Sequence, residues 1–199
     1  MKAVRRAAAS LLLPLLLATG LTSCSASADP EPPPRPAAPP SSGPAPSRSG
    51  DPTDSAWVQL MIPMDEQAVA LLAMAAKRTA DPRLRSWATR LRTAQDAELT
   101  ALRGLRDRMG LPATDVHAGH NMPGMVTADD LVKARAAEGA TFDRLLVAQI
   151  RDHLRQSAQV SRSETTAGTR ADARERARAL VSAREAQLAD LEALAVNGG

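Results

Sequence analysis

Residues 81–109 have the sequence DPRLRSWATRLRTAQDAELTALRGLRDRM, which predicts one long amphipathic helix. Asp81 is a residue type that caps helices, and Pro82 suits the first helical position because no backbone donor is needed there. Apolar residues then recur at helical spacing: Leu84, Ala88, Leu91, Leu102, Leu105 and Met109. Gly110 and Pro112 end the pattern, so the helix should stop near Met109.

Three further helical patterns accompany this one, at about residues 54–79, 127–164 and 170–196. Asp54 is the expected cap of the first, and Pro63 inside it predicts a kink or a short preceding turn. Thr127 begins the next, which we expect to continue past Gly139. Ala, Leu, Arg and Glu dominate the composition and aromatic residues are few. We therefore expect an all-α fold, a four-helix antiparallel bundle over residues 54–197.

The small positive charge of the chain is a property of its first six residues. The 199 residues include 25 Lys and Arg against 22 Asp and Glu, a formal net charge of +3. Lys2, Arg5 and Arg6 account for this excess, because the remaining residues balance at 22 of each sign. Since the remaining charges are interspersed and few aromatic residues are present to stack on bases, we expect no nucleic-acid partner.

A lipoprotein signal follows these charges. Residues 7–18 form an apolar run that is too short for a permanent membrane span. The run leads to Leu21-Thr-Ser-Cys24, which resembles the lipobox of bacterial lipoproteins. We expect residues 1–23 to be a signal peptide, and Cys24 to carry acyl chains such as palmitate that anchor the protein to the cell membrane. The alternative is an ordinary secretory signal, and both interpretations predict an extracytoplasmic protein.

Residues 24–53 are rich in Pro and Ser and contain almost no large apolar side chains. Such a segment cannot bury enough surface to offset the entropy of ordering it, and Pro favours extended conformations. The segment is therefore predicted to be a disordered tether between the acylated Cys24 and the helical domain.

Polar side chains interrupt the apolar faces of three predicted helices. The stripe of the second helix continues from Leu91 through Gln95 and Glu98, while Asp65 and His153 fall on the apolar faces of the first and third. Buried charge is costly unless it is paired or bound to a metal. Convergence of these residues would form either a metal site or a hydrogen-bonded polar cluster, and both interpretations remain open from sequence alone.

Catalytic signatures are not evident in the sequence. Dinuclear carboxylate sites in helical bundles use Glu-x-x-His pairs, and no Glu in this chain has a His three residues later. No Ser lies in a nucleophile-elbow context, and the single Cys is the expected acylation site. We therefore expect a protein that is not an enzyme.

A loop rich in His and Met separates the second and third helical patterns. His117, His120, Met122 and Met125 fall within nine residues, in the order His-Ala-Gly-His-Asn-Met-Pro-Gly-Met. Imidazole and thioether ligands suit copper, particularly Cu(I), whereas Met is a poor zinc ligand. The alternative is a turn whose Met side chains pack onto the bundle. Three methionines of the first helix are either further thioether ligands or core-filling residues: Met61, Met64 and Met74.

Several of these motifs resemble the domain of unknown function 305 (DUF305) family. Leu60-Met-Ile-Pro-Met-Asp-Glu-Gln-Ala68 is similar to its first signature, which usually reads Met-Ile-Pro-His-His-Glu-Gln-Ala. Further similar stretches cover residues 81–84, 94–99, 122–125 and 138–145. The resemblance covers about residues 55–195. It implies a ferritin-like helical bundle, typically extracytoplasmic, and some members are associated with copper binding or copper tolerance.

The chain departs from the family at its paired histidines. Met64 and Asp65 stand where the first signature has His-His, and His153 alone remains of the second pair, beside Asp152.

Together these features predict a membrane-anchored lipoprotein that binds copper, or a similar soft metal, for buffering or delivery outside the cytoplasm. The loop ligands His117, His120, Met122 and Met125 would be primary. A secondary set would lie in the bundle interior: Met64, Asp65, Glu98 and His153. The alternative is a non-catalytic structural or interaction module that has lost the metal. The sequence indicates no particular protein partner.

Overall fold

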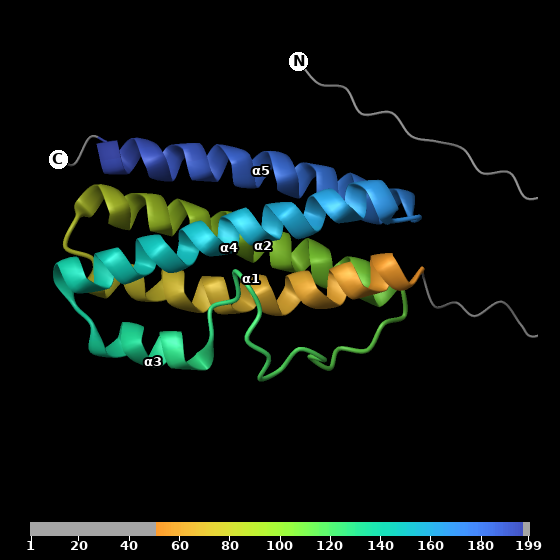
Figure 1. The fold of residues 1–199 in the computed structure, drawn as a ribbon, viewed down its shortest axis with the longest axis horizontal. Helices are drawn as coiled ribbons and strands as arrows, with labels where there is room; N and C mark the ends of the chain where they lie inside the picture. Colours follow the sequence, from red (N-terminus) through yellow and green to blue (C-terminus); the bar gives the residue numbers. More distant parts are fainter. Residues whose placement is uncertain (1–50, 197–199) are drawn as a thin grey trace, which may run out of the picture. The chain divides into compact units, whose positions relative to one another are not determined.

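The computed structural model describes residues 51–196, which form five α-helices with no strand in that range (Figure 1). The helices are α1 (Pro52–Arg78), α2 (Pro82–Arg108), α3 (Ala128–Ala136), α4 (Gly139–Ala167) and α5 (Ala171–Val196). The fold is all-helical as expected, but the described residues contain five helices instead of four. The expected signal peptide, Cys24 and nearly all of the expected tether lie outside the described residues.

The first helix begins one turn earlier than expected. Asp51 is its cap and accepts a hydrogen bond from the Thr53 backbone nitrogen at 2.8 Å, with Pro52 in the first turn. Asp54, the expected cap, is fully buried inside that first turn. It reaches across to the start of α5, where it accepts hydrogen bonds from the backbone nitrogens of Thr169 at 3.0 Å and Arg170 at 3.2 Å. Asp54 therefore holds the turn that leads into α5, and it does not cap the helix that contains it.

The long helices otherwise follow their predicted signals closely. Pro63 is buried within α1, and the helix continues on both sides of it, so the short preceding turn suggested by the sequence is absent. The second helix begins as predicted: the Asp81 carboxylate accepts a hydrogen bond from the Arg83 backbone nitrogen at 2.7 Å. The third predicted helical region, in contrast, is interrupted.

This interruption separates α3 from α4. Thr127 and Asp130 form a reciprocal capping box that starts α3. The backbones of Ala137 and Glu138 are extended, and Gly139 has a φ of 56°, in the left-handed region that favours glycine. The chain therefore turns at this point, and the expectation of one helix through Gly139 was wrong.

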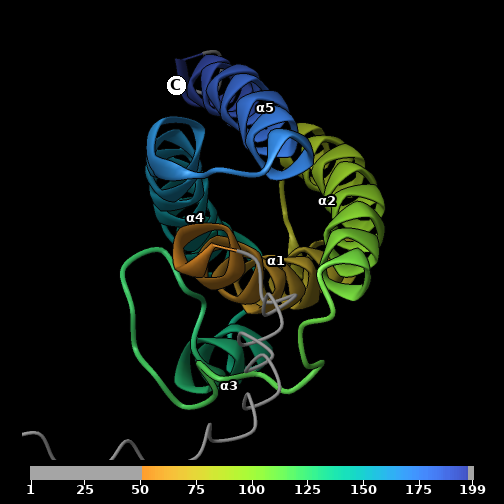
Figure 2. The ribbon, with the colours of Figure 1, turned by 90° about the vertical axis from the view of Figure 1, so that its right-hand side faces the viewer.

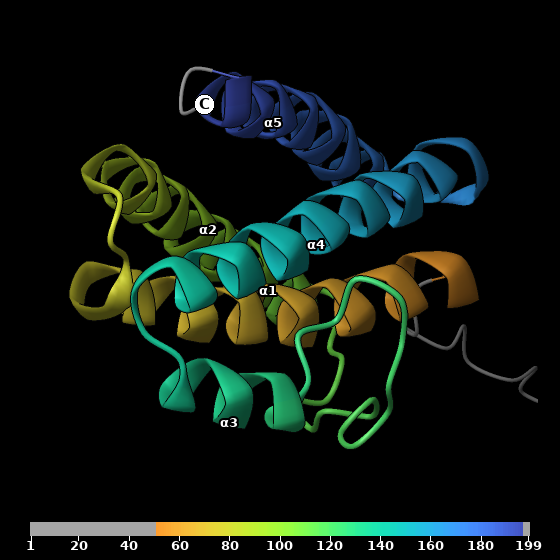
Figure 3. The same cartoon turned by 60° about the vertical axis from the view of Figure 1, so that its left-hand side comes forward.

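The four long helices surround a common axis, and α3 lies outside them beside α1 (Figures 1 and 2). In the end view, the order around the axis is α1, α2, α5 and α4. Helix α1 packs extensively against α2 and α4, and α4 packs extensively against α5. Fewer contacts join α2 to α5, and Figure 3 shows the two helices diverging along part of their length. The α2–α5 face is therefore the most open side of the bundle.

The interior is divided into two apolar clusters. The turn-end cluster lies where α1 ends and α2 begins, and includes Leu72, Trp87, Phe142 and Leu191. The loop-end cluster, at the other end, includes Trp57, Met61, Met64, Leu102, Met109 and Met125. Polar residues occupy the interior between them, at matching heights on the four long helices. We call this set the polar layer: Asp65, Gln95, Glu98, His153, Ser157 and Arg184.

Among the described residues, only α1 is long and apolar enough to cross a membrane. More than half of its most apolar segment is buried inside the bundle. This burial identifies α1 as a core helix, and its apolar character is explained by packing.

Candidate functional site: a buried polar layer and a histidine loop

Arg184 is the centre of the polar layer. It comes from α5, is fully buried, and directs its guanidinium between α1 and α2. Its Nη2 donates to Asp65 Oδ1 at 3.0 Å and to Glu98 Oε1 at 2.6 Å, while Nη1 donates to Glu98 Oε2 at 3.0 Å. A planar guanidinium suits this arrangement because its donors match the two oxygens of a carboxylate.

The remaining donors of Arg184 are also used. Nε donates to Ser157 Oγ on α4 at 2.9 Å, and Nη1 donates to Gln187 Oε1 on its own helix at 3.1 Å. The guanidinium thus joins α1, α2, α4 and α5 at one level of the bundle. A buried charge with this number of partners fixes the relative positions of the helices, because any sliding would leave it unpaired.

His153 lies on the other side of Asp65. Its Nε2 is 3.4 Å from Asp65 Oδ1 and 3.0 Å from the side-chain nitrogen of Gln95. Burial, with the nearby Arg184 charge, lowers the pKa of His153 to about 3. The imidazole is therefore neutral at physiological pH, and Arg184 is the permanent cation of the layer.

The two carboxyl groups share this single cation. Burial raises the pKa of Asp65, although Arg184 opposes the change. Burial and the neighbouring Asp65 carboxylate raise the pKa of Glu98 to about 9. Two ionised carboxylates would leave the layer with one excess negative charge, so a proton shared by the pair balances Arg184 at neutral pH.

Several polar atoms of the layer have no hydrogen-bond partner in the structure. They are Asp65 Oδ2, Gln95 Oε1 and His153 Nδ1. Buried polar atoms without a partner are costly, and a bound ion is one explanation for them. Even so, no group of three or more His, Cys, Asp or Glu side chains in residues 51–196 is arranged to hold a metal ion.

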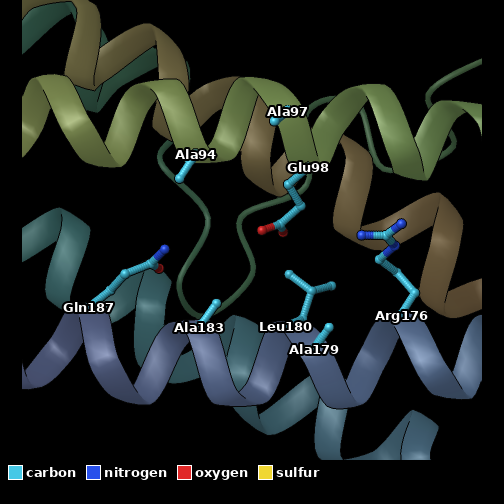
Figure 4. Close-up of a pocket in the computed structure, with 8 residues that line it drawn as sticks. All are labelled: Ala94, Ala97, Glu98, Arg176, Ala179, Leu180, Ala183 and Gln187. Carbon is cyan, nitrogen blue, oxygen red and sulfur yellow. The ribbon is translucent and has the colours of Figure 1, made fainter.

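A surface hollow leads toward the layer on the open side of the bundle. It lies between α2 and α5 and has a volume of about 250 Å³ (Figure 4). Its walls are mainly small side chains, and Glu98 projects into it from α2. The Glu98 side chain keeps 10% of its surface exposed, whereas Asp65 and Arg184 are fully enclosed.

The His/Met loop has two faces. His117 and His120 lie near each other, with ring centroids 6.1 Å apart and planes at 70°. A hydrogen bond from the His120 backbone nitrogen to the His117 carbonyl at 2.9 Å closes the turn, and Asp115 accepts from the His117 backbone nitrogen at 2.8 Å. Gly119, with a φ of 78°, permits this tight turn. His120 is exposed and His117 is half-buried, so the pair is accessible to solvent.

The methionines of the loop point into the protein. Met125 is 5% exposed in the loop-end cluster, and Met122 packs against the same cluster. Gly124 makes the close approach to α4 possible, because a Cβ there would lie 2.3 Å from the Cβ of Gln156 and 2.9 Å from the Asp152 carbonyl oxygen. The predicted four-residue ligand set is therefore divided between an accessible histidine pair and two thioethers in or against the loop-end cluster.

The interior set has a different composition from the one inferred from sequence. The structure brings Asp65, Glu98 and His153 together, while Met64 packs in the loop-end cluster. The residue that sequence reasoning missed is Arg184. The sequence of α5 contains a signal for it, because Ala177, Arg184 and Leu191 are spaced seven residues apart. Arg184 therefore lies on the same helix face as two buried apolar residues.

The family model for the domain of unknown function DUF305 matches residues 54–195. The chain belongs to the DUF305 family. The stretch similar to its first signature includes Asp65, and His153 is what remains of its second histidine pair, so both lie in the polar layer. The similar stretch at residues 122–125 lies on the loop. No curated protein matches this DUF305 chain by sequence.

Solved structures share the fold of this DUF305 protein. The candidate secreted protein DUF305 from Streptomyces coelicolor is 21% identical, with a TM-score of 0.64, over 71% of this chain and 91% of that one. A DUF305 fragment from Deinococcus radiodurans is 17% identical, with a TM-score of 0.65, over 73% and 96%. CopM in its Cu(II)-bound form is 18% identical, with a TM-score of 0.62, over 72% and 96%. At these identities the likeness shows the fold.

Proposed function

We propose that this DUF305 protein binds copper at the His117–His120 pair and serves in metal buffering or delivery outside the cytoplasm. The observation that carries the proposal is the approach of the two imidazoles on an accessible loop, with ring centroids 6.1 Å apart. Metal–nitrogen bonds are about 2 Å long, so a single ion held by both rings needs ring nitrogens within about 4 Å of each other. Small rotations of the two side chains bring their ring nitrogens to that nitrogen–nitrogen distance.

Copper fits the chemistry of the loop better than harder ions. Imidazole nitrogen is a good ligand for copper, and thioether sulfur favours Cu(I) in particular. Met122 is only partly buried and follows His120 by two residues, so it is the thioether best placed to join the pair. Met125 and Met64 would need to leave the core, and we assign them to packing.

The surroundings of the pair support an exposed binding site. A hollow of about 300 Å³ lies beside His120 and is lined by polar side chains that include Asn121 and Asp129. An ion bound there would be open to exchange with a partner or a small ligand. This accessibility suits buffering and delivery, and the proposed role is binding without catalysis.

The proposed location follows from the N-terminal sequence and from the comparisons. The lipobox-like stretch ending at Cys24 supports a lipid anchor on the extracytoplasmic side of the cell membrane. The candidate secreted protein from Streptomyces coelicolor has the same fold, and CopM, also of this fold, carries Cu(II).

A Cu(I) titration against a competing chelator tests the binding proposal. We expect the protein to take up copper with at least micromolar affinity, and His117→Ala with His120→Ala to abolish that uptake. Val116→Ala, an exposed residue of the same loop, is the matched control and should bind normally. Unchanged copper uptake by the double histidine variant would contradict the proposal.

The second candidate function is a structural or interaction module without metal. It is favoured by Arg184, which supplies inside the bundle the positive charge that a metal ion would otherwise provide. Failure of the protein to bind copper at all would favour this candidate.

A further inference from the structure

The polar layer contains the donor types of a metal site. Two carboxylates and an imidazole come from three different helices of the bundle: Asp65, Glu98 and His153. The amide of Gln95 adjoins the imidazole. Helical bundles build metal sites from inward-facing carboxylates and imidazoles of this kind, on facing helices.

Arg184 occupies the point on which the two carboxylates converge. Its Nη2 lies 3.0 Å from Asp65 Oδ1 and 2.6 Å from Glu98 Oε1. A metal ion bound to the same two oxygens would lie about 2 Å from each, so its position overlaps that of the nitrogen. The guanidinium and a metal ion therefore exclude each other on steric grounds, and repulsion between their charges adds to the exclusion.

Charge balance leads to the same conclusion. With Arg184 in place, a fixed positive charge already lies between the two carboxyl groups. Without Arg184, a divalent ion in its place would balance both carboxylates. Asp65 Oδ2 and Gln95 Oε1, which both belong to the layer, have no hydrogen-bond partner.

We infer that Arg184 is a built-in cation that occupies a latent divalent-metal site in the bundle interior. Arg184 thus closes the bundle interior to divalent metal ions. The inference does not depend on the proposed copper function, because it concerns different residues in a different part of the fold.

A zinc titration tests this inference in the full chain carrying His117→Ala and His120→Ala, so that the loop histidines do not contribute. We expect this parent to bind no zinc and the added change Arg184→Ala to create one zinc equivalent of micromolar affinity or tighter. Further addition of Asp65→Asn should remove that equivalent. Arg184→Lys, which retains a cation, is the matched control and should bind none.

Folding is monitored by circular dichroism in the same samples. If Arg184→Ala unfolds the protein, zinc should restore the helical signal, and the same amount of magnesium should not. The inference is overturned if the Arg184→Ala protein, folded or unfolded, neither binds zinc nor responds to it. The inference is also overturned if the parent binds zinc and loses that binding with Asp65→Asn. The layer would then hold metal with Arg184 present.

Discussion

Replacing Arg184 by Met removes the cation of the polar layer while keeping most of the side-chain volume. The guanidinium makes five hydrogen bonds to four side chains, and three of them go to carboxylate oxygens. Hydrogen bonds to charged groups contribute about 1.5–3 kcal/mol each, so simple addition gives about 4.5–9 kcal/mol. Uptake of a second proton by the Asp65–Glu98 pair would offset part of this loss.

The expected loss is therefore about 3–5 kcal/mol at pH 7, the range for removing one partner of a buried ion pair. This is a large part of the 5–15 kcal/mol that stabilises a typical domain. Urea unfolding followed by circular dichroism measures it. The matched control is Arg176→Met, which removes a partly exposed arginine two turns earlier on α5 and should cost less than about 1 kcal/mol.

The loss should also depend on pH. Without Arg184, the folded-state pKa values of Asp65 and Glu98 rise further above their unfolded values of 3.8 and 4.5. When the folded state raises a carboxyl pKa, the free energy of unfolding falls as pH increases above the unfolded pKa. The variant should therefore be less stable at pH 8 than at pH 5. A loss equal to that of Arg176→Met, with no pH dependence, would refute the description of Arg184 as a buried, paired charge.

Two other predictions follow from named contacts, and a third follows from the N-terminal sequence. Glu164→Gln should stabilise the protein above about pH 5. Burial and the nearby Asp54 raise the pKa of Glu164 to about 8, so ionisation from pH 4.5 to 8 favours the unfolded state. Urea unfolding between pH 5 and 9 measures this, and a free energy of unfolding that varies with pH as it does in the unchanged protein would contradict it. Gly124→Ala should lower the free energy of unfolding by about 1–3 kcal/mol more than Gly119→Ala does. Both glycines have a positive φ, but only a Cβ at Gly124 would collide with α4. Equal melting temperatures of the two variants would show that the loop does not pack as described. Cys24→Ala should abolish labelled palmitate incorporation and release the protein from the membrane fraction; retained label would place acylation elsewhere.

Local sequence signals predicted most helix boundaries, and tertiary contacts explain the main exception. Asp81 caps α2 where the sequence places the cap. The break between α3 and α4 was missed because alanine and glutamate around it favour helix. It is held from outside by Arg78, at the end of α1, which donates to the Ala137 carbonyl at 3.0 Å and lies 3.7 Å from Glu138. A partner 59 residues away leaves no local signal.

Helical spacing predicted part of the interior site for a simple reason. Asp65, Glu98 and His153 each interrupt an otherwise apolar stripe, so their inward direction follows from helix geometry. Arg184 also lies on such a stripe, but α5 carries three other arginines, of which Arg178 is exposed and Arg174 and Arg176 are half-buried. The position of its partners, which only the packed helices reveal, distinguishes the buried arginine from the others.

The chain contains three histidines, so one spectrum reports on both candidate sites. The most direct measurement is a ¹⁵N-edited NMR spectrum of the imidazole side chains during titration with Cu(I). We predict that the signals of His117 and His120 shift together and reach completion at one equivalent, while the signals of His153 stay unchanged. Shifts of His153 with unchanged His117 and His120 would contradict the account, because copper would then bind in the layer that Arg184 closes.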